Sequence, residues 1–280
     1  QFHHLWILND IGQVLRFNPK NETFSLYPSA DSNKGDNYFS AAKLVQLSPS
    51  ELWILDPGEY GASHIVVDST EEAHIHHIGR DADETQGTRV NNVFMEKSGQ
   101  RWALTKQGAA TISQQDTILT LNYIPLPDSL PAFQMIETDQ ELLIASAQGK
   151  VILYDKTKKR FSSVPIGAPS EEITHIFSLD DAHFCTISSD YTIRVVDLKD
   201  WTVKGTRTMD GSTEKIWQDE RKNVYAKLKS KNIIYEIDAR SHAIREEFTH
   251  SQTSSATLRD TMGVSWTAEP NAGIRKVVNF

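Results

Sequence analysis

The chain has 280 residues, of which 39% are hydrophobic, and 29 Lys and Arg against 37 Asp and Glu give a formal net charge of −8. This acidic balance argues against a general nucleic-acid binder, which presents a basic surface, and no run approaches the roughly 18 apolar residues of a membrane-spanning helix. The single cysteine, Cys185, excludes an internal disulfide framework and a zinc site built on cysteines.

A repeat of about forty residues runs through the sequence. The first unit contains Leu5–Leu8, Gly12 and Val14–Pro19, followed by Phe24 and Tyr27. A Trp or another apolar residue recurs at the same place in each later unit. The seven anchors, 41 to 49 residues apart, are Trp6, Trp53, Trp102, Leu143, Phe184, Tyr225 and Trp266.

Each unit has the pattern of short β-strands. Side chains alternate in character along Val14–Phe17 and Ile193–Val196, and turn pairs such as Asn-Asp, Pro-Gly and Ser-Asp separate the runs at hairpin spacing. One more apolar run lies between successive anchors, as at Lys43–Leu47. Four strands per unit are typical of a propeller blade, so we predict an all-β fold, one β-propeller domain over residues 1–280 with seven four-stranded blades.

Glu214–Leu228 has an alternative interpretation as a helix, because its apolar residues roughly suit an α-helical period. The repeat register instead predicts a turn at Asp219–Lys222 with strands on either side. The register also starts the chain at the second strand of the first unit and stops it after the third strand of the last. We therefore expect 26 strands rather than 28, in a part excised from a longer multi-domain chain that supplies the missing strands.

The first unit has the most specific pattern. Leu5–Tyr27 combines Leu-Trp-Ile, a turn with glycine, Leu-Arg-Phe-Asn-Pro-Lys and Thr-Phe-x-x-Tyr. In this it resembles the two-component regulator propeller repeat of Bacteroides-type hybrid two-component regulators. Units four to six keep the third strand of that repeat with its terminal Asp, at Val151–Asp155, Ile193–Asp197 and Ile233–Asp238.

The resemblance implies a periplasmic sensor region that belongs to an inner-membrane protein. Such receptors usually carry two propellers, an immunoglobulin-like module, a membrane helix and cytoplasmic histidine kinase parts, and they often detect oligosaccharides derived from polysaccharides. WD-repeat, kelch and quinoprotein-type propellers share the periodicity, but the Gly-His and Trp-Asp pairs of WD repeats are absent from the repeating positions. The partners implied are an oligosaccharide, an adjacent module of the same chain and a second copy.

Two patterns bear on metal binding. His74-Ile75-His76-His77 places two imidazoles on one strand face, but no Cys or repeated carboxylate follows at a recognisable spacing, so we interpret it as a solvated outer strand. Asp81-x-Asp83-x-Thr85 resembles the start of a calcium loop, yet Gln86 and Asn92 stand where that loop needs Gly and Glu. We expect no metal and no cofactor.

Catalytic motifs are absent as well. Carboxylates such as Glu51 and Asp180 form no recognisable glycosidase pair, there is no Gly-x-Ser-x-Gly elbow, and Cys185 falls in a core strand. We expect no catalytic residue in this region. A protein-binding scaffold and, less favoured, a propeller glycosidase or lyase stay open as alternatives to the sensor.

Ligand binding is the favoured interpretation, on the loops that gather at one face of a propeller. Sugars are bound by aromatic faces and planar hydrogen-bonding groups, and acidic sugars by arginine. The candidate ligand-binding residues are Tyr38, Tyr60, Arg80, Arg89 and Trp217. The four anchor tryptophans, Trp6, Trp53, Trp102 and Trp266, are assigned to packing within the blades.

Overall fold

The structure, a computed structural model, describes residues 5–8, 14–18, 21, 23–27, 43–48, 50–55, 62–68, 73–78, 90–115, 118–229, 231, 233–248, 256–259, 265–269 and 273–277. Over these ranges the chain forms 26 β-strands and one short 3-10 helix, η1 (Pro127–Ser129). The all-β fold and the number of strands agree with the prediction from the repeat. No helix within these ranges is long and apolar enough to cross a membrane.

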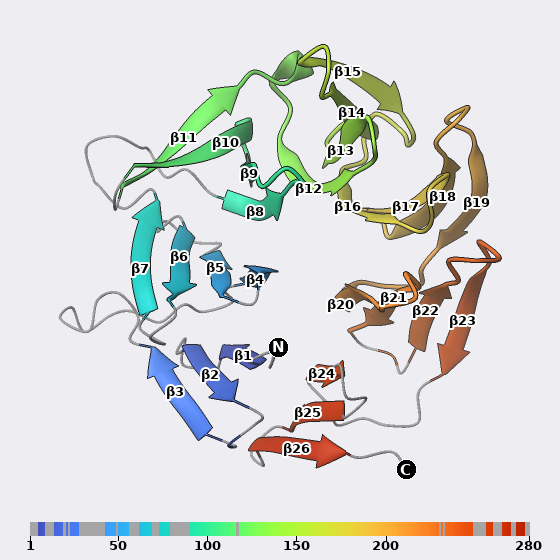
Figure 1. Ribbon diagram of the computed structural model, residues 1–280. Helices are drawn as coiled ribbons and strands as arrows, with labels where there is room; N and C mark the ends of the chain where they lie inside the picture. The colour runs from blue at the N-terminus through green and yellow to red at the C-terminus, as the bar shows by residue number, and fades with distance from the viewer. Residues whose placement is uncertain are drawn as a thin grey trace. The chain divides into compact units, whose positions relative to one another are not determined.

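The described strands form seven antiparallel sheets, one for each repeat unit, five with four strands and two with three (Figure 1). The first three sheets are β1 (Leu5–Leu8), β2 (Val14–Asn18) and β3 (Thr23–Tyr27); β4 (Lys43–Ser48), β5 (Glu51–Leu55), β6 (Ala62–Val67) and β7 (Ala73–Ile78); and β8 (Val90–Met95), β9 (Arg101–Thr105), β10 (Gly108–Gln115) and β11 (Ile118–Ile124).

The remaining sheets follow the same order along the chain. They are β12 (Ala132–Glu137), β13 (Glu141–Ser146), β14 (Lys150–Asp155) and β15 (Arg160–Pro165); β16 (Ile173–Ser178), β17 (His183–Ser188), β18 (Thr192–Asp197) and β19 (Val203–Thr208); β20 (Thr213–Gln218), β21 (Val224–Leu228), β22 (Ile233–Ile237) and β23 (Ile244–Phe248); and β24 (Ala256–Arg259), β25 (Ser265–Glu269) and β26 (Gly273–Val277). Strands β20 and β21 occupy the segment for which a helix was the alternative, and a turn at Asp219–Lys222 joins them.

The chain divides into two compact units, residues 1–206 and 207–280. The first holds the sheets from β1–β3 to β16–β19 except for the last two residues of β19, and the second holds the sheets β20–β23 and β24–β26. A single domain with seven blades stays a prediction. The site described below lies wholly in the first unit.

Alternation along β5 packs its sheet between two neighbours. Leu52 and Ile54 join the core shared with β2 of the first sheet, whereas Trp53 and Leu55 join the core shared with β8, β9 and β10. Trp53 is fully buried, and burial of a side chain of this size stabilises the fold by roughly 3 kcal/mol or more. Successive sheets of the first unit therefore bury both faces against each other, as the repeat predicts.

The first strand of each four-stranded sheet carries a register irregularity, as between Val90 and Asn92 in β8 and between Ile173 and His175 in β16. In the first unit these strands lie beside one another, β8 with β12 and β12 with β16. One such bulge is fixed across sheets, since Asn91 Nδ2 donates to the backbone oxygen of Ala132 at 2.8 Å. A bulge bends a strand and increases its twist, which accommodates the close approach of neighbouring first strands.

Candidate functional site

The structure places one of the five predicted ligand-binding residues. Trp217 lies half-buried in β20, where its ring stacks on Tyr225 at 5.3 Å and Lys215 Nζ lies 5.6 Å from its centroid. Tyr38, Tyr60, Arg80 and Arg89 lie outside the described residues, as do the Asp81–Thr85 pattern and the side chain of Trp266. The assignment of these five residues to a ligand stays a prediction.

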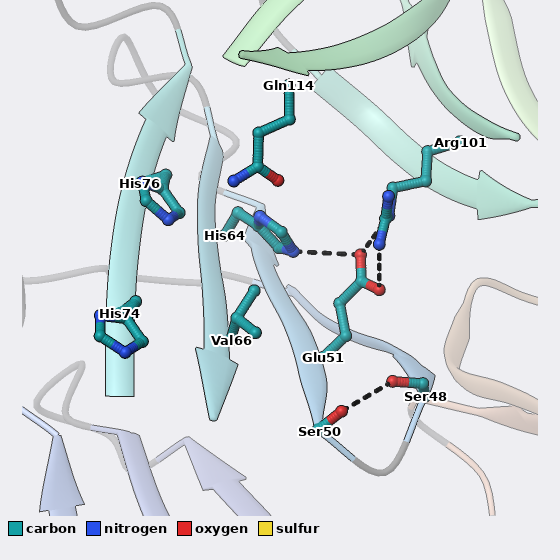
Figure 2. A pocket seen from close by; sticks show the side chains of 9 residues that line it. All are labelled: Ser48, Ser50, Glu51, His64, Val66, His74, His76, Arg101 and Gln114. Atoms are coloured by element: carbon teal, nitrogen blue, oxygen red, sulfur yellow. Dashed lines mark hydrogen bonds and ion pairs between the residues drawn. The ribbon is translucent and has the colours of Figure 1, made fainter. Parts of the chain in front are cut away.

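A cavity of about 510 Å³ opens at the end of the β4–β7 sheet where β4 and β6 finish and β5 and β7 begin. Its lining is polar and comes from two neighbouring sheets (Figure 2). The lining residues are Ser48, Ser50, Glu51, His64, Val66, His74, His76, Arg101 and Gln114. Arg101 and Gln114, on β9 and β10, are contributed by the next sheet.

Strand register brings the central residues of this cavity together. In the β5–β6 pair Glu51 is opposite Val66 and Trp53 is opposite His64, so all four share the face that meets the third sheet. The same face of β5 carries Trp53 and Leu55 into the apolar core. The polar cavity is therefore the outer end of a hydrophobic interface between two sheets.

Glu51 is the most highly coordinated side chain of the cavity. Arg101 donates from Nε to Oε1 at 2.7 Å and from Nη2 to Oε2 at 2.9 Å, and Trp53 Nε1 donates to Oε1 at 3.2 Å. His64 Nε2 lies 3.0 Å from the same Oε1. Because an ionised carboxylate only accepts hydrogen bonds, Nε2 is the protonated nitrogen of this imidazole.

The electrostatics of Glu51 follow from these contacts. Burial alone raises the pKa of the carboxyl, but hydrogen bonds from His64, Arg101 and Trp53 outweigh it and lower the pKa to about 2. The paired carboxylate in turn raises the pKa of Arg101 above its ordinary value, despite partial burial of the guanidinium. Both groups keep their charges at neutral pH, so the centre of the cavity is a fixed ion pair that joins two sheets.

His64 is held rigidly beside that ion pair. Its ring stacks on Trp53 with centroids 4.3 Å apart and planes 17° apart, and the residue is only 1% exposed. On the neighbouring strand His76 is directly opposite His64, with ring centroids 6.1 Å apart. His74, two residues earlier on β7, is half-exposed and lies 3.1 Å from Asp68 Oδ2 through Nε2.

Sequence reasoning found His74 and His76 but not the rest of the cavity. Glu51 was one carboxylate among many, and Arg101 was the start of a strand. A usable signal exists: the residue paired with the anchor Trp is Arg16 in the first unit and His64 in the second. A strongly polar side chain at a position that the repeat buries needs partners, and these partners build the cavity.

Cys185, by contrast, is where the sequence placed it. The residue is fully buried in β17, and burial raises the pKa of its thiol far above the ordinary value. A protonated, inaccessible thiol is a packing group and not a nucleophile.

Comparisons by sequence give no relative: no protein-family model matches the chain, and no curated protein matches it. Comparison by structure gives many matches.

Three of the matching structures come from proteins of different kinds. The virginiamycin B lyase from Staphylococcus aureus has a TM-score of 0.65 at 12% identity, with 97% of this chain and 92% of the lyase aligned. The WD40 β-propeller domain of Doa1 has a TM-score of 0.63 at 12% identity, with 98% and 88% aligned.

The third is the extracellular domain of a protein from B. thetaiotaomicron that is described as a one component system. Its TM-score is 0.62 at 14% identity, and 97% of this chain aligns with 40% of that structure. A lyase, a WD40 domain and the extracellular domain of a one component system share a fold here and not a function. The chain therefore has a β-propeller fold.

Proposed function

We propose that this chain is a ligand-binding propeller from the periplasmic sensor region of a hybrid two-component regulator, and that the Glu51–Arg101 cavity receives an oligosaccharide fragment. The observation that carries the proposal is this polar cavity of about 510 Å³ with a fixed ion pair at its centre. Cavities of roughly 300–1,000 Å³ are the usual size for small-ligand sites.

The lining has the chemistry that a sugar requires. Ser48, Ser50 and Gln114 offer both donors and acceptors, and the imidazoles of His74 and His76 add flat faces and further hydrogen-bonding nitrogens. Glu51 and Arg101 neutralise each other in the ion pair, so the cavity favours a neutral polar ligand over a charged one. Because Glu51, His64 and Arg101 are already held in place, little conformational entropy is lost when a ligand binds.

The sensor context of the proposal rests on two further supports. Leu5–Tyr27 resembles the repeat of two-component regulator propellers, and the fold is shared with the extracellular domain of the one component system from B. thetaiotaomicron. A periplasmic location, an adjacent propeller or immunoglobulin-like module and a homodimer belong to the same proposal. The ligand would then alter the contacts of this propeller with its neighbours in the receptor.

A matched pair of variants tests the cavity. Gln114 lines it, whereas Gln115 follows on the same strand and points to the opposite face. For an oligosaccharide that binds the wild type in a calorimetric titration, we expect Gln114→Ala to weaken binding by about tenfold, the effect of about 1.4 kcal/mol of lost hydrogen bonding. Gln115→Ala keeps the wild-type affinity. Equal affinities in both variants would place the ligand elsewhere.

A protein-docking role is the second candidate, and one observation favours it. Phe24 and Leu26 are 53% and 56% exposed on the same face of β3, and exposed apolar side chains side by side mark interaction surfaces. If the chain self-associates through this strand, Phe24→Ser with Leu26→Ser abolishes the dimer in sedimentation velocity. A dimer that survives both substitutions excludes this surface.

A further inference from the structure

Three imidazoles share one wall of the cavity. His64 is directly opposite His76, and His74 is opposite Val66 in the same β6–β7 pair, so the three rings project from one face of two adjacent strands. All three line the cavity, and Figure 2 shows His64 between the strand of His76 and the carboxylate of Glu51. Neutral imidazole nitrogens are good ligands for zinc, copper and nickel ions.

The hydrogen bonding of His64 leaves one ring nitrogen available to bind a metal ion. Its Nε2–H is directed to Glu51, which leaves the lone pair on Nδ1, and this buried atom has no hydrogen-bond partner among the described residues. A buried polar atom without a partner is costly. In metal sites a ligating histidine almost always donates its other N–H to a carboxylate or carbonyl, which fixes the tautomer and the ring orientation.

His74 repeats that arrangement on the neighbouring strand. Its Nε2 lies 3.1 Å from Asp68 Oδ2, so the same ring nitrogen is engaged and Nδ1 keeps its lone pair. His76 lies two residues further along β7, a spacing that keeps both rings on one face. The pairs His64–Glu51 and His74–Asp68, with His76 beside them, are not expected of an outer strand whose side chains only face solvent.

We infer that His64, His74 and His76 form a binding site for one divalent transition-metal ion of the zinc, copper or nickel class, with Glu51 and Asp68 orienting two of the ligands. Metal–nitrogen distances are about 2.0–2.1 Å. The 6.1 Å between the rings of His64 and His76 therefore closes by rotation of the two side chains on β7, which are exposed or half-buried. Magnesium and calcium are excluded because they prefer oxygen ligands. The site does not depend on whether a sugar binds.

The test is a calorimetric titration of the purified chain with ZnCl₂ at neutral pH. We expect one Zn²⁺ to bind at this site, and at least a tenfold loss of its affinity in each of His76→Ala and His74→Ala. Asp68→Asn, at a partly exposed residue, weakens Zn²⁺ binding by about tenfold through His74 without endangering the fold. X-ray absorption on the loaded wild type shows three imidazole ligands.

Two controls separate this site from its surroundings. His183→Ala removes the imidazole of another group of side chains that could hold a metal ion, in which His183 pairs with Asp180. In this background His76→Ala and His74→Ala still weaken Zn²⁺ binding at least tenfold. Gln114→Ala keeps the wild-type affinity for Zn²⁺. The metal site is therefore tested separately from the oligosaccharide site, and either proposal can fail without the other. A wild type that takes up no Zn²⁺, or a His183→Ala chain in which His76→Ala no longer weakens Zn²⁺ binding, would overturn the inference.

Discussion

At the scale of the residue, the ionised carboxylate of Glu51 in the cavity makes the free energy of unfolding depend on pH in the acid range. Its pKa of about 2 lies below the ordinary value near 4.3 of an unfolded chain. The ionised form therefore stabilises the native state fully above about pH 5, and that stabilisation is lost as the pH falls toward 2. The contribution is about 3 kcal/mol.

Glu51→Gln tests that link. In urea-unfolding curves measured from pH 7 to pH 3, we expect the free energy of unfolding of the wild type to fall more steeply below pH 5 than that of the variant. Glu172→Gln, at an exposed carboxylate of the same unit, keeps the wild-type slope. Parallel curves for wild type and Glu51→Gln would show that the carboxyl is not held in this network.

His175 gives a second prediction that depends on pH. Burial, together with a smaller effect of the positive charge of Lys43, lowers the pKa of this imidazole to about 4. The unfolded chain takes up this proton near pH 6.5, so the side chain removes stability as the pH falls from about 6.5 toward 4. An NMR titration of the imidazole resonances should give a midpoint near pH 4, and a midpoint at 6.5 would contradict this environment.

At the scale of the residue, the sequence predicts which side chains are buried better than which side chains contact each other. Trp53, Trp102 and Cys185 were assigned to packing, and all three are buried. Trp217 was chosen as a ligand contact, and the structure gives it a stacking partner, Tyr225. The ion pair of Glu51 with Arg101 was not foreseen, because 50 positions separate the two residues and only the register of two sheets brings them together.

At the scale of the element, the hairpin between β13 and β14 depends on one glycine. Gly149 has φ of +62°, and a Cβ there would lie 2.4 Å from the backbone oxygen of Ala168. Its N–H donates to the oxygen of Glu171, and its own oxygen accepts from Ile166 and Gly167. The backbone on both sides is therefore fixed and cannot move away from a methyl group.

Gly149→Ala consequently destabilises the chain by about 3 kcal/mol, because steric overlap adds to the left-handed conformation. Gly99→Ala is the matched control: its φ is +87° and nothing lies within 4 Å of the added carbon, so it costs about 1 kcal/mol. Chemical denaturation of the two variants measures the difference. Similar losses in both would show that the hairpin relaxes around the methyl group.

The elements themselves followed from the sequence to a large extent. Alternating patterns and turn residues predicted the hairpins, and the repeat register correctly chose strands over a helix at β20 and β21. The bulges in the first strands were not predicted. A bulge depends on how neighbouring first strands pack, as the hydrogen bond from Asn91 to Ala132 in the next sheet shows. A contact between sheets of this kind cannot be recognised from the local sequence pattern of one strand.

At the scale of the whole molecule, the repeat predicted the propeller fold from the sequence alone. Identity to the compared propellers is only 12–14%, so the fold is shared across very different sequences. The cavity is not a property of the repeat. It arises where one unit has Glu51 and His64 and the next has Arg101 and Gln114, a combination visible only after neighbouring sheets are packed.

The most direct test of the account is a thermal-shift screen of the purified chain against oligosaccharides from complex polysaccharides. A ligand at about 100 times its dissociation constant adds roughly 2.7 kcal/mol of stability, which raises the melting temperature by several degrees. We predict such a shift for one class of neutral oligosaccharide in the wild type and in Gln115→Ala, and a much smaller shift in Gln114→Ala. A folded chain that no oligosaccharide stabilises, or equal shifts in the two variants, would contradict the cavity as a sugar site.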